Sequence, residues 1–355
     1  MSASASKAAN PAIASRAAEH SFEPQLSLPG MDALAAEWVW AEEGERMGFS
    51  HATVMKAEVV AAIAPREGGV YVDATVGGGG HAEAILAAAP RTRLFAVDRD
   101  PVALEAARER LAPFGDRVTF IHAPFGSIAD ELAARGVSKV DGLCADLGVS
   151  SPQIDEPTRG MSFRHEGPLD MRMDPTRGET ALEHIQRSSE EELADEIFHM
   201  ADERRSRRIA RSIKRAQRDG ELASTLDLRR AIVRAVGPMR VGGVDPATRT
   251  FQALRMHIND ELGQLEKALA GAVDVLDTGG RLAVISFHSL EDRVVKRFMQ
   301  RESQLDPALA ELPVVPPQLT PRLRLVGRKL RPSPEEVARN PRARSALLRV
   351  AEKAV

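Results

Sequence analysis

Cysteine is almost absent from this 355-residue chain, which contains only Cys144. A single cysteine excludes an internal disulfide and any metal site built from several thiolates, and we expect no metal. Its place in an apolar run favours a buried, unreactive thiol. The chain also lacks an apolar stretch of about 20 residues, which is the length needed to cross a membrane. Its N-terminus does not show the basic start and apolar segment of a secretory signal peptide. We therefore expect a cytoplasmic protein without a membrane partner.

Aromatic residues make up only 4% of the chain, and the net charge of −3 is small. So few aromatic side chains disfavour RNA recognition by base stacking on a sheet surface, and phosphate contacts would have to position any nucleic acid. Residues 1–48 hold seven acids against three bases, which leaves 45 bases and 44 acids in the remainder. A nearly neutral body can still bind phosphate where its positive charge is clustered.

Four consecutive glycines, Gly77 to Gly80, separate a strand-like segment from a run of good helix formers. Glycines permit positive φ and close approach of a ligand, and the helix start behind them offers unpaired N–H groups. The strand expected next ends in Asp98, whose carboxylate can accept hydrogen bonds from ribose hydroxyls. A nucleotide-like ligand is therefore expected. The glycines alone do not distinguish NAD from S-adenosylmethionine.

Helices and strands alternate between residues 51 and 146. The pattern predicts helices at 51–64, 81–89, 101–112 and 127–135, and strands at 70–75, 93–98, 118–122 and 140–146. This alternation predicts an α/β fold with a mostly parallel, doubly wound sheet. Ligands of such sheets bind at the carboxyl ends of the strands, so His81, Asp98, Phe125 and Asp146 are expected at one edge.

The alternation stops after Asp146. A loop-rich segment reaches residue 178, and helices are expected at 179–186, 189–201, 203–218 and 225–236. The sheet then resumes with one long helix at 248–277, a strand at 281–287, a helix at 289–300, a proline-rich loop at 303–321 and a last strand at 346–351. We interpret 154–245 as an inserted all-helical domain, 49–153 and 246–355 as one discontinuous domain, and 1–48 as a disordered extension.

The C-terminal part of the chain favours S-adenosylmethionine over NAD. A dinucleotide-binding fold usually repeats its mononucleotide-binding half, and residues 281–355 contain no second glycine turn after a strand. The chain has one mononucleotide-binding half, followed by a polar loop at Gly148 to Gln153. This arrangement suits S-adenosylmethionine, whose sulfonium methyl group must face a nucleophile.

Five blocks of sequence carry a family resemblance: Asp146–Gln153, Gly167–Gly178, Ala247–Ala253, Ile285–Arg293 and Asn340–Ser345. In this order they resemble the MraW (RsmH) family, over about His51 to Lys353. The family methylates N4 of a decoding-site (P-site) cytidine in 16S ribosomal RNA. The resemblance implies a Rossmann-like class I methyltransferase fold, S-adenosylmethionine as cofactor, and 16S rRNA of the small ribosomal subunit as partner.

The same resemblance implies which residues hold the cofactor. Gly79, Gly80 and His81 would line its methionine and ribose portion, and Asp98 would hold the ribose. Phe125, Asp146 and Gln153 would surround the adenine and the sulfonium end. No oligomeric state follows from it.

The target atom can be argued from chemistry. Cytosine N4 is a weak nucleophile, so an enzyme must hold the amine in line with the methyl group and accept its hydrogens. Methylation at C5 would need a cysteine nucleophile, and the only cysteine lies within an expected strand. Nitrogen is therefore the better target. The candidate catalytic residues are Asp146, Ser150, Ser151 and Pro152, with Asp170, Asp174 and His288 as weaker candidates.

Arginines crowd the helix expected at 203–218. A base inside folded RNA must leave its stack to be modified, and the helical insertion adjoins the site-forming loop. One face of this helix carries Arg204, Arg208, Arg211, Arg215 and Arg218. Only Glu203 and Asp219 are acids close in sequence, so we expect a largely unpaired positive surface that contacts RNA phosphates. Two alternatives stay open: an NAD-dependent oxidoreductase and a non-catalytic RNA-binding factor.

Overall fold

The computed structural model describes residues 53–240, 243–305 and 320–354. The disordered extension expected at 1–48 and most of the loop expected at 303–321 lie outside these residues. None of the described helices combines the length and the apolar character needed to span a bilayer.

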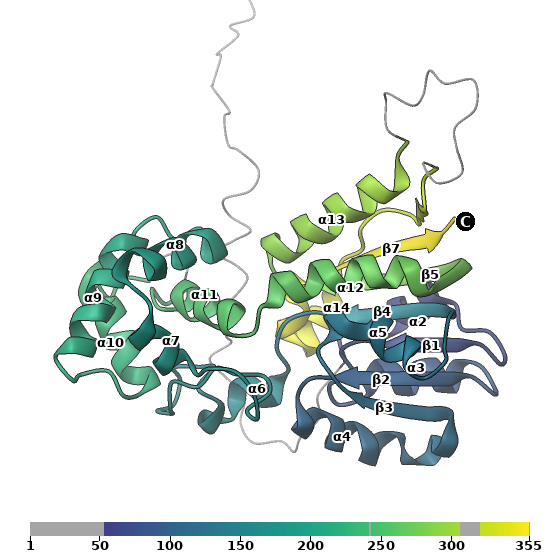
Figure 1. Ribbon diagram of the computed structural model, residues 1–355, viewed down its shortest axis with the longest axis horizontal. Coiled ribbons are helices and arrows are strands. Elements are labelled where there is room, and N and C mark those ends of the chain that lie inside the picture. The colour runs from purple at the N-terminus through teal and green to yellow at the C-terminus, as the bar shows by residue number, and fades with distance from the viewer. Residues whose placement is uncertain (1–52, 241–242, 306–319, 355) are drawn as a thin grey trace, which may run out of the picture.

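A seven-stranded sheet with the order β3-β2-β1-β4-β5-β7-β6 forms the centre of the larger lobe (Figure 1). Its strands are β1 (Val70–Asp73), β2 (Arg93–Asp98), β3 (Val118–His122), β4 (Val140–Asp146), β5 (Leu276–Ser286), β6 (Leu323–Leu325) and β7 (Leu347–Lys353). Strands β1 to β5 pair in parallel, whereas β7 is antiparallel to both β5 and β6. The predicted mostly parallel, doubly wound sheet is confirmed, and β6 is a strand that the sequence did not indicate.

Helices cover both faces of the sheet (Figure 1). On one face lie α2 (Lys56–Ile63), α3 (Gly80–Ala88) and α4 (Pro101–Leu111), and on the other α5 (Ile128–Ala133), α12 (Glu261–Val275) and α13 (Ser289–Ser303). Because successive strand residues point to opposite faces, Leu143 packs with the second layer and Cys144 with the first. Burial raises the pKa of the Cys144 thiol well above its ordinary value, so this cysteine is inert as expected.

A second core lies in a helical lobe beside the sheet (Figure 1). Its helices are α7 (Ala181–Arg187), α8 (Glu190–Ala201), α9 (Ser206–Arg218), α10 (Thr225–Val236) and α11 (Thr248–Ile258). Capping boxes at Thr180, Ser189 and Ser224 begin three of them, which satisfies N–H groups that a helix start leaves unpaired. These helices lie between β4 and β5 in the chain, and the inserted helical domain stays a prediction. Its boundaries at 154 and 245 stay predictions, and the helical core continues past 245 into α11.

The single helix predicted at 248–277 is wrong, because the chain breaks between α11 and α12. Asp260 has a φ of 49°, and Asn259 is buried. The Asn259 side chain accepts from the Met173 N–H at 2.7 Å and donates to the Met171 carbonyl at 2.8 Å. Apolar residues keep a helical spacing on both sides of the break. The reason is that α11 buries one face in the helical core and α12 buries one face against the sheet.

Several short elements also went unpredicted. They are α6 (Ser151–Asp155), α14 (Pro334–Arg339) and the 3-10 turns η1 (Ala112–Arg117), η2 (Phe125–Ser127), η3 (Pro157–Arg159) and η6 (Pro341–Ser345). Strand β5 begins at Leu276 instead of 281, so it follows α12 directly. Of these elements, α6 and η2 form part of the edge where β1, β2 and β4 end.

Candidate active site

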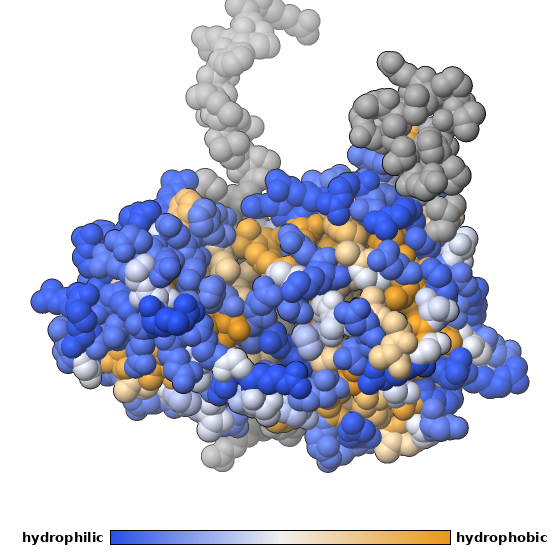
Figure 2. Space-filling model, viewed as in Figure 1, coloured by the Kyte–Doolittle hydropathy of each residue, from blue (hydrophilic) through white to orange (hydrophobic). Residues whose placement is uncertain are grey.

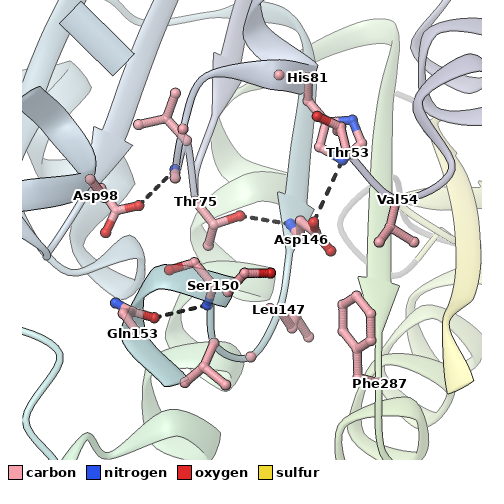
Figure 3. Close-up of a pocket in the computed structure, with 18 of the residues that line it drawn as sticks. Thr53, Val54, Thr75, His81, Asp98, Asp146, Leu147, Ser150, Gln153 and Phe287 are labelled. Carbon is pink, nitrogen blue, oxygen red and sulfur yellow. Dashed lines mark hydrogen bonds and ion pairs between the residues drawn. The ribbon is translucent and has the colours of Figure 1, made fainter. Parts of the chain in front are cut away.

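A pocket lies at the carboxyl ends of β1, β2 and β4 (Figure 3). Eight of the residues predicted for the site line it: Gly80, His81, Asp98, Phe125, Asp146, Ser150, Ser151 and Gln153. Two predicted residues, Gly79 and Pro152, do not line it. The parallel strand order brings these distant segments together, because adjacent parallel strands end at a common edge.

The glycine turn after β1 leaves part of the main chain open to the pocket. Gly77 and Gly79 have φ values of 49° and 82°, and Gly79 is the N-cap of α3. A Cβ on Gly79 would face α4, at 3.5 Å from the Cα of Ala107, so this glycine serves helix packing. A Cβ on Gly78 would meet no heavy atom within 4 Å. A ligand can therefore approach the backbone closely at Gly78.

Asp98 lies at the end of β2 and anchors the turn. One of its carboxylate oxygens accepts from the Gly77 N–H at 2.9 Å, and the other accepts from the Asp100 N–H at 2.9 Å. Removal of the carboxylate from water raises the pKa of Asp98 to about 6, against the pull of these backbone N–H groups. Further hydrogen bonds from a ligand would favour its ionised form.

Asp146 and His81 lie side by side in the lining of the pocket (Figure 3). The Asp146 N–H donates to the Thr75 hydroxyl at 2.6 Å, and the His81 Nε2 lies 3.6 Å from Asp146 Oδ2. Burial lowers the pKa of His81, but the Asp146 carboxylate outweighs this effect and raises it above the ordinary value. Asp146 Oδ1 and both ring nitrogens of His81 are buried without a hydrogen-bond partner among the described residues. Such unpaired buried atoms call for a polar ligand.

Gln153 fixes the loop that follows β4. Its Oε1 accepts from the Ser150 N–H at 2.9 Å, and its Nε2 donates to Asp100 at 2.8 Å. Asp100 in turn pairs with Arg159 at 2.9 Å and is buried. Ser150 is the N-cap residue of α6. The loop between Asp146 and α6 is therefore held at the pocket by a buried polar network.

The weaker catalytic candidates lie elsewhere. Asp170 forms a bidentate pair with Arg172, as a salt-bridged loop would, and Asp174 accepts from Thr176. His288 is buried, caps α13 and pairs with Glu291 at 3.0 Å. None of Asp170, Asp174 and His288 lines the pocket.

The C-terminal half of the chain contributes lining residues that the sequence analysis did not assign to the site: Phe287, Glu291, Asn340 and Arg342. Phe287 follows β5 and faces the pocket near Val54 and Leu147 (Figure 3). All four lie in two of the blocks that carried the family resemblance, which was the signal available. Thr75, which the strand pattern also placed at this edge, binds the Asp146 N–H.

The arginine face of α9 is less isolated than predicted. Helix α8 supplies acids: Glu190 pairs with Arg211 and Asp195 with Arg207, both at 3.1 Å. Asp219 lies 3.7 Å from Arg215. The expectation of a nearly unpaired positive run is therefore wrong, because acids distant in sequence pack beside it.

Three arginines of the predicted face, Arg204, Arg208 and Arg218, are exposed and have no ion pair with a described residue. The lobe that carries them presents a mainly hydrophilic surface on the side shown in Figure 2. These three side chains therefore lack the ion pairs that Arg211 and Arg215 have.

The sheet order, with antiparallel β7 inserted between β5 and β6, and the pocket at the ends of β1, β2 and β4 define a Rossmann-like methyltransferase, a class of enzyme that uses S-adenosylmethionine. No second mononucleotide-binding half, which a dinucleotide-binding fold usually has, occurs among the described strands. The chain belongs to the MraW methylase family, whose model matches residues 48–354.

Two relatives of high sequence identity agree with this family. The chain is 57% identical to Ribosomal RNA small subunit methyltransferase H from Sorangium cellulosum, over 86% of this chain and 91% of that protein. It is 50% identical to the protein of the same name from Halorhodospira halophila, over 90% and 99% of the two chains. Among solved structures, an rRNA methylase from Streptococcus thermophilus matches with a TM-score of 0.38 and 13% identity, over 85% and 95% of the chains.

The residues of the pocket fit S-adenosylmethionine. The open backbone at Gly78 and the carboxylate of Asp98 suit a nucleoside with free ribose hydroxyls. The unpaired atoms of Asp146 and His81 suit the polar groups of its amino-acid portion or of an incoming amine.

Proposed function

We propose that this chain methylates N4 of a P-site cytidine in 16S rRNA of the small ribosomal subunit. One observation carries the choice of a nitrogen target: the pocket presents the Asp146 carboxylate with an unpaired oxygen, and its lining contains no cysteine. The names of the relatives, Ribosomal RNA small subunit methyltransferase H, support rRNA as the substrate. A ribosomal substrate also implies that the enzyme acts in the cytoplasm.

The reaction needs a donor, an acceptor and an oriented amine. S-adenosylmethionine, when bound, supplies an electrophilic methyl group. Asp98 holds ribose hydroxyls, and the glycine turn that Asp98 anchors keeps the backbone open at Gly78. Phe125, the first residue of η2 after β3, lines the pocket and offers an aromatic face to adenine.

Asp146 accepts a hydrogen from the exocyclic amine and so increases the electron density on N4. Its backbone is tied to Thr75 at 2.6 Å, which fixes the position of the carboxylate. His81 Nε2, 3.6 Å from Asp146 Oδ2, helps to orient the carboxylate. The Ser150 and Ser151 segment, held by Gln153, provides further acceptors for the amine and for ring atoms of the base.

The inserted helical domain, for which we propose the boundaries 154 and 245, holds the RNA around the extruded base. Arg204, Arg208 and Arg218 would contact phosphates, and the ion-paired Arg211 and Arg215 would contribute less. A single face of positive charge positions RNA without reading its sequence, so the pocket must select the base.

Mass spectrometry of the product nucleoside tests the proposal. Small subunits that lack the modification are incubated with the enzyme and S-adenosylmethionine carrying a labelled methyl group, and the RNA is digested to nucleosides. We expect label in N4-methylcytidine from one site in 16S rRNA. Label in 5-methylcytidine or in a 2′-O-methyl nucleoside would contradict the assignment of the target atom. Tight binding of the particle with no label transfer would favour the non-catalytic RNA-binding factor.

A further inference from the structure

Two histidines and a glutamate from three helices meet in the helical lobe, away from the pocket. His184 of α7, Glu196 of α8 and His257 of α11 bring their ligand atoms within 4.8 Å of one another. His184 Nε2 lies 2.7 Å from Glu196 Oε2, and His257 Nε2 lies 3.8 Å from Glu196 Oε1. Both imidazoles therefore direct the same ring nitrogen toward one carboxylate.

We propose that His184, Glu196 and His257 bind a divalent transition metal ion, with Zn²⁺ as the best fit. Two imidazole nitrogens and one carboxylate oxygen form a known zinc ligand set, with water in the fourth position. Bond lengths near 2 Å require ligand atoms roughly 3.3 Å apart, which small side-chain rotations reach from the observed spacing. Mg²⁺ and Ca²⁺ prefer oxygen ligands and fit less well.

The surroundings of His184 support a metal ligand. Its other ring nitrogen, Nδ1, lies 3.3 Å from Glu179 Oε1, and Glu179 is held by Arg187. A carboxylate behind a histidine is the arrangement that orients imidazole ligands toward a metal and increases their basicity. The His184 side chain is 1% exposed, whereas that of His257 is 31% exposed, so an ion can enter beside His257.

The packing of the two rings also suits a shared ion. Their centroids lie 4.2 Å apart with an interplanar angle of 34°. Without an ion, the single Glu196 carboxylate faces both rings. A cation bound between the three side chains would coordinate both ring nitrogens and balance the carboxylate charge.

A second group of possible ligands, Glu261, His288 and Glu291, is a poorer site. Arg255 donates to both carboxylate oxygens of Glu261, at 2.7 and 3.0 Å, so these oxygens already have a partner. The buried guanidinium would also repel a cation. In the first group, Arg187 contacts Nδ1 of His184, the ring nitrogen that does not face Glu196.

Calorimetric titration of the full chain with Zn²⁺ tests this proposal, using protein made without a histidine tag. We expect one ion per chain, a higher melting temperature with Zn²⁺, and no binding of Mg²⁺. His257→Ala and Glu196→Gln should each weaken Zn²⁺ binding at least tenfold. His199→Ala, which removes an exposed histidine of α8 outside the group, should leave it unchanged.

Three outcomes would overturn the proposal. The first is a wild-type chain that binds no Zn²⁺. The second is binding that survives both substitutions but is lost in His288→Gln, which would assign the ion to the second group. X-ray absorption of the zinc-loaded wild-type chain gives a test that does not depend on how the variants fold. The spectrum should show two imidazole ligands. A spectrum without imidazole ligands is the third outcome that would overturn the proposal.

Discussion

The carboxylate of Asp98 at the end of β2 accepts a 2.9 Å hydrogen bond from the backbone N–H of Gly77, in the turn after β1. Its other oxygen accepts from the Asp100 N–H just before α4. One side chain thus fixes the glycine turn and the start of the next helix. A carboxylate offers about four acceptor positions, so Asp98 retains capacity for two ribose hydroxyls.

Substitution of Asp98 should weaken cofactor binding. Loss of two hydrogen bonds to a charged acceptor, together with loss of the turn's anchor, should raise the Kd for S-adenosylmethionine in Asp98→Ala about 10- to 100-fold. Asp116→Ala, at an exposed position of η1, is the matched control and should keep the wild-type Kd. Calorimetry measures both, and equal affinities for the Asp98 variant and the wild type would remove Asp98 from the site.

Asp146→Asn should separate chemistry from cofactor binding. The amide keeps the shape of the side chain, and the backbone bond to Thr75 is unaffected, but the amide cannot take up a proton. We expect kcat to fall about 10²- to 10⁴-fold with a much smaller change in the Kd for S-adenosylmethionine. Single-turnover methyl transfer to small subunits measures the rate. A rate within twofold of the wild type would show that Asp146 is not the acceptor.

Asp73, buried behind the pocket, should make stability depend on pH. Burial raises its pKa to about 6 from an ordinary 3.8, and its Oδ2 has no partner among the described residues. A raised folded-state pKa stabilises the fold at low pH, and this contribution is lost as pH rises from about 4 through about 6. Asp73→Asn should remove this dependence of stability on pH, which amounts to at most about 3 kcal/mol.

Urea unfolding of both chains at several pH values measures this effect. The free energy of unfolding of Asp73→Asn relative to wild type should increase between pH 4 and pH 7. A difference that stays constant over this range would mean that the pKa of Asp73 is not raised.

Much of the fold could be predicted because local patterns determine it. Strands β2, β3 and β4 have the predicted bounds, since each closes with apolar residues followed by one polar residue. The break at Asn259 could not be found this way. Its cause is a pair of hydrogen bonds to Met171 and Met173, which are more than 80 residues away in the sequence.

The sequence predicts those residues of the candidate site that lie at the ends of parallel strands. Asp98 and Asp146 end parallel strands, so the sheet topology alone brings them to one edge. Phe287 and Arg342 enter the pocket through the packing of β5 and η6, which no local pattern encodes. The acids of α8 that pair with the arginines of α9 also depend on tertiary packing.

The distribution of ion pairs on α9 predicts unequal roles for its arginines. Arg208→Ala should weaken binding to the small subunit and reduce the salt dependence of binding by about one counterion, because Arg208 has no ion pair with a described residue. Arg211→Ala, whose side chain pairs with Glu190 at 3.1 Å, should have a smaller effect. Filter binding over a range of salt concentrations measures both slopes. Equal slopes for wild type and Arg208→Ala would exclude a phosphate contact at this position.

The central claim is that the pocket between the glycine turn, Asp98 and Asp146 binds a sulfonium donor. A crystal structure of the protein soaked with S-adenosylmethionine tests it most directly. We expect density in this pocket, with ribose hydroxyls on Asp98 and the sulfonium methyl pointing toward the Asp146 and Ser150 side. An empty pocket, or the ligand at another surface, would contradict the account.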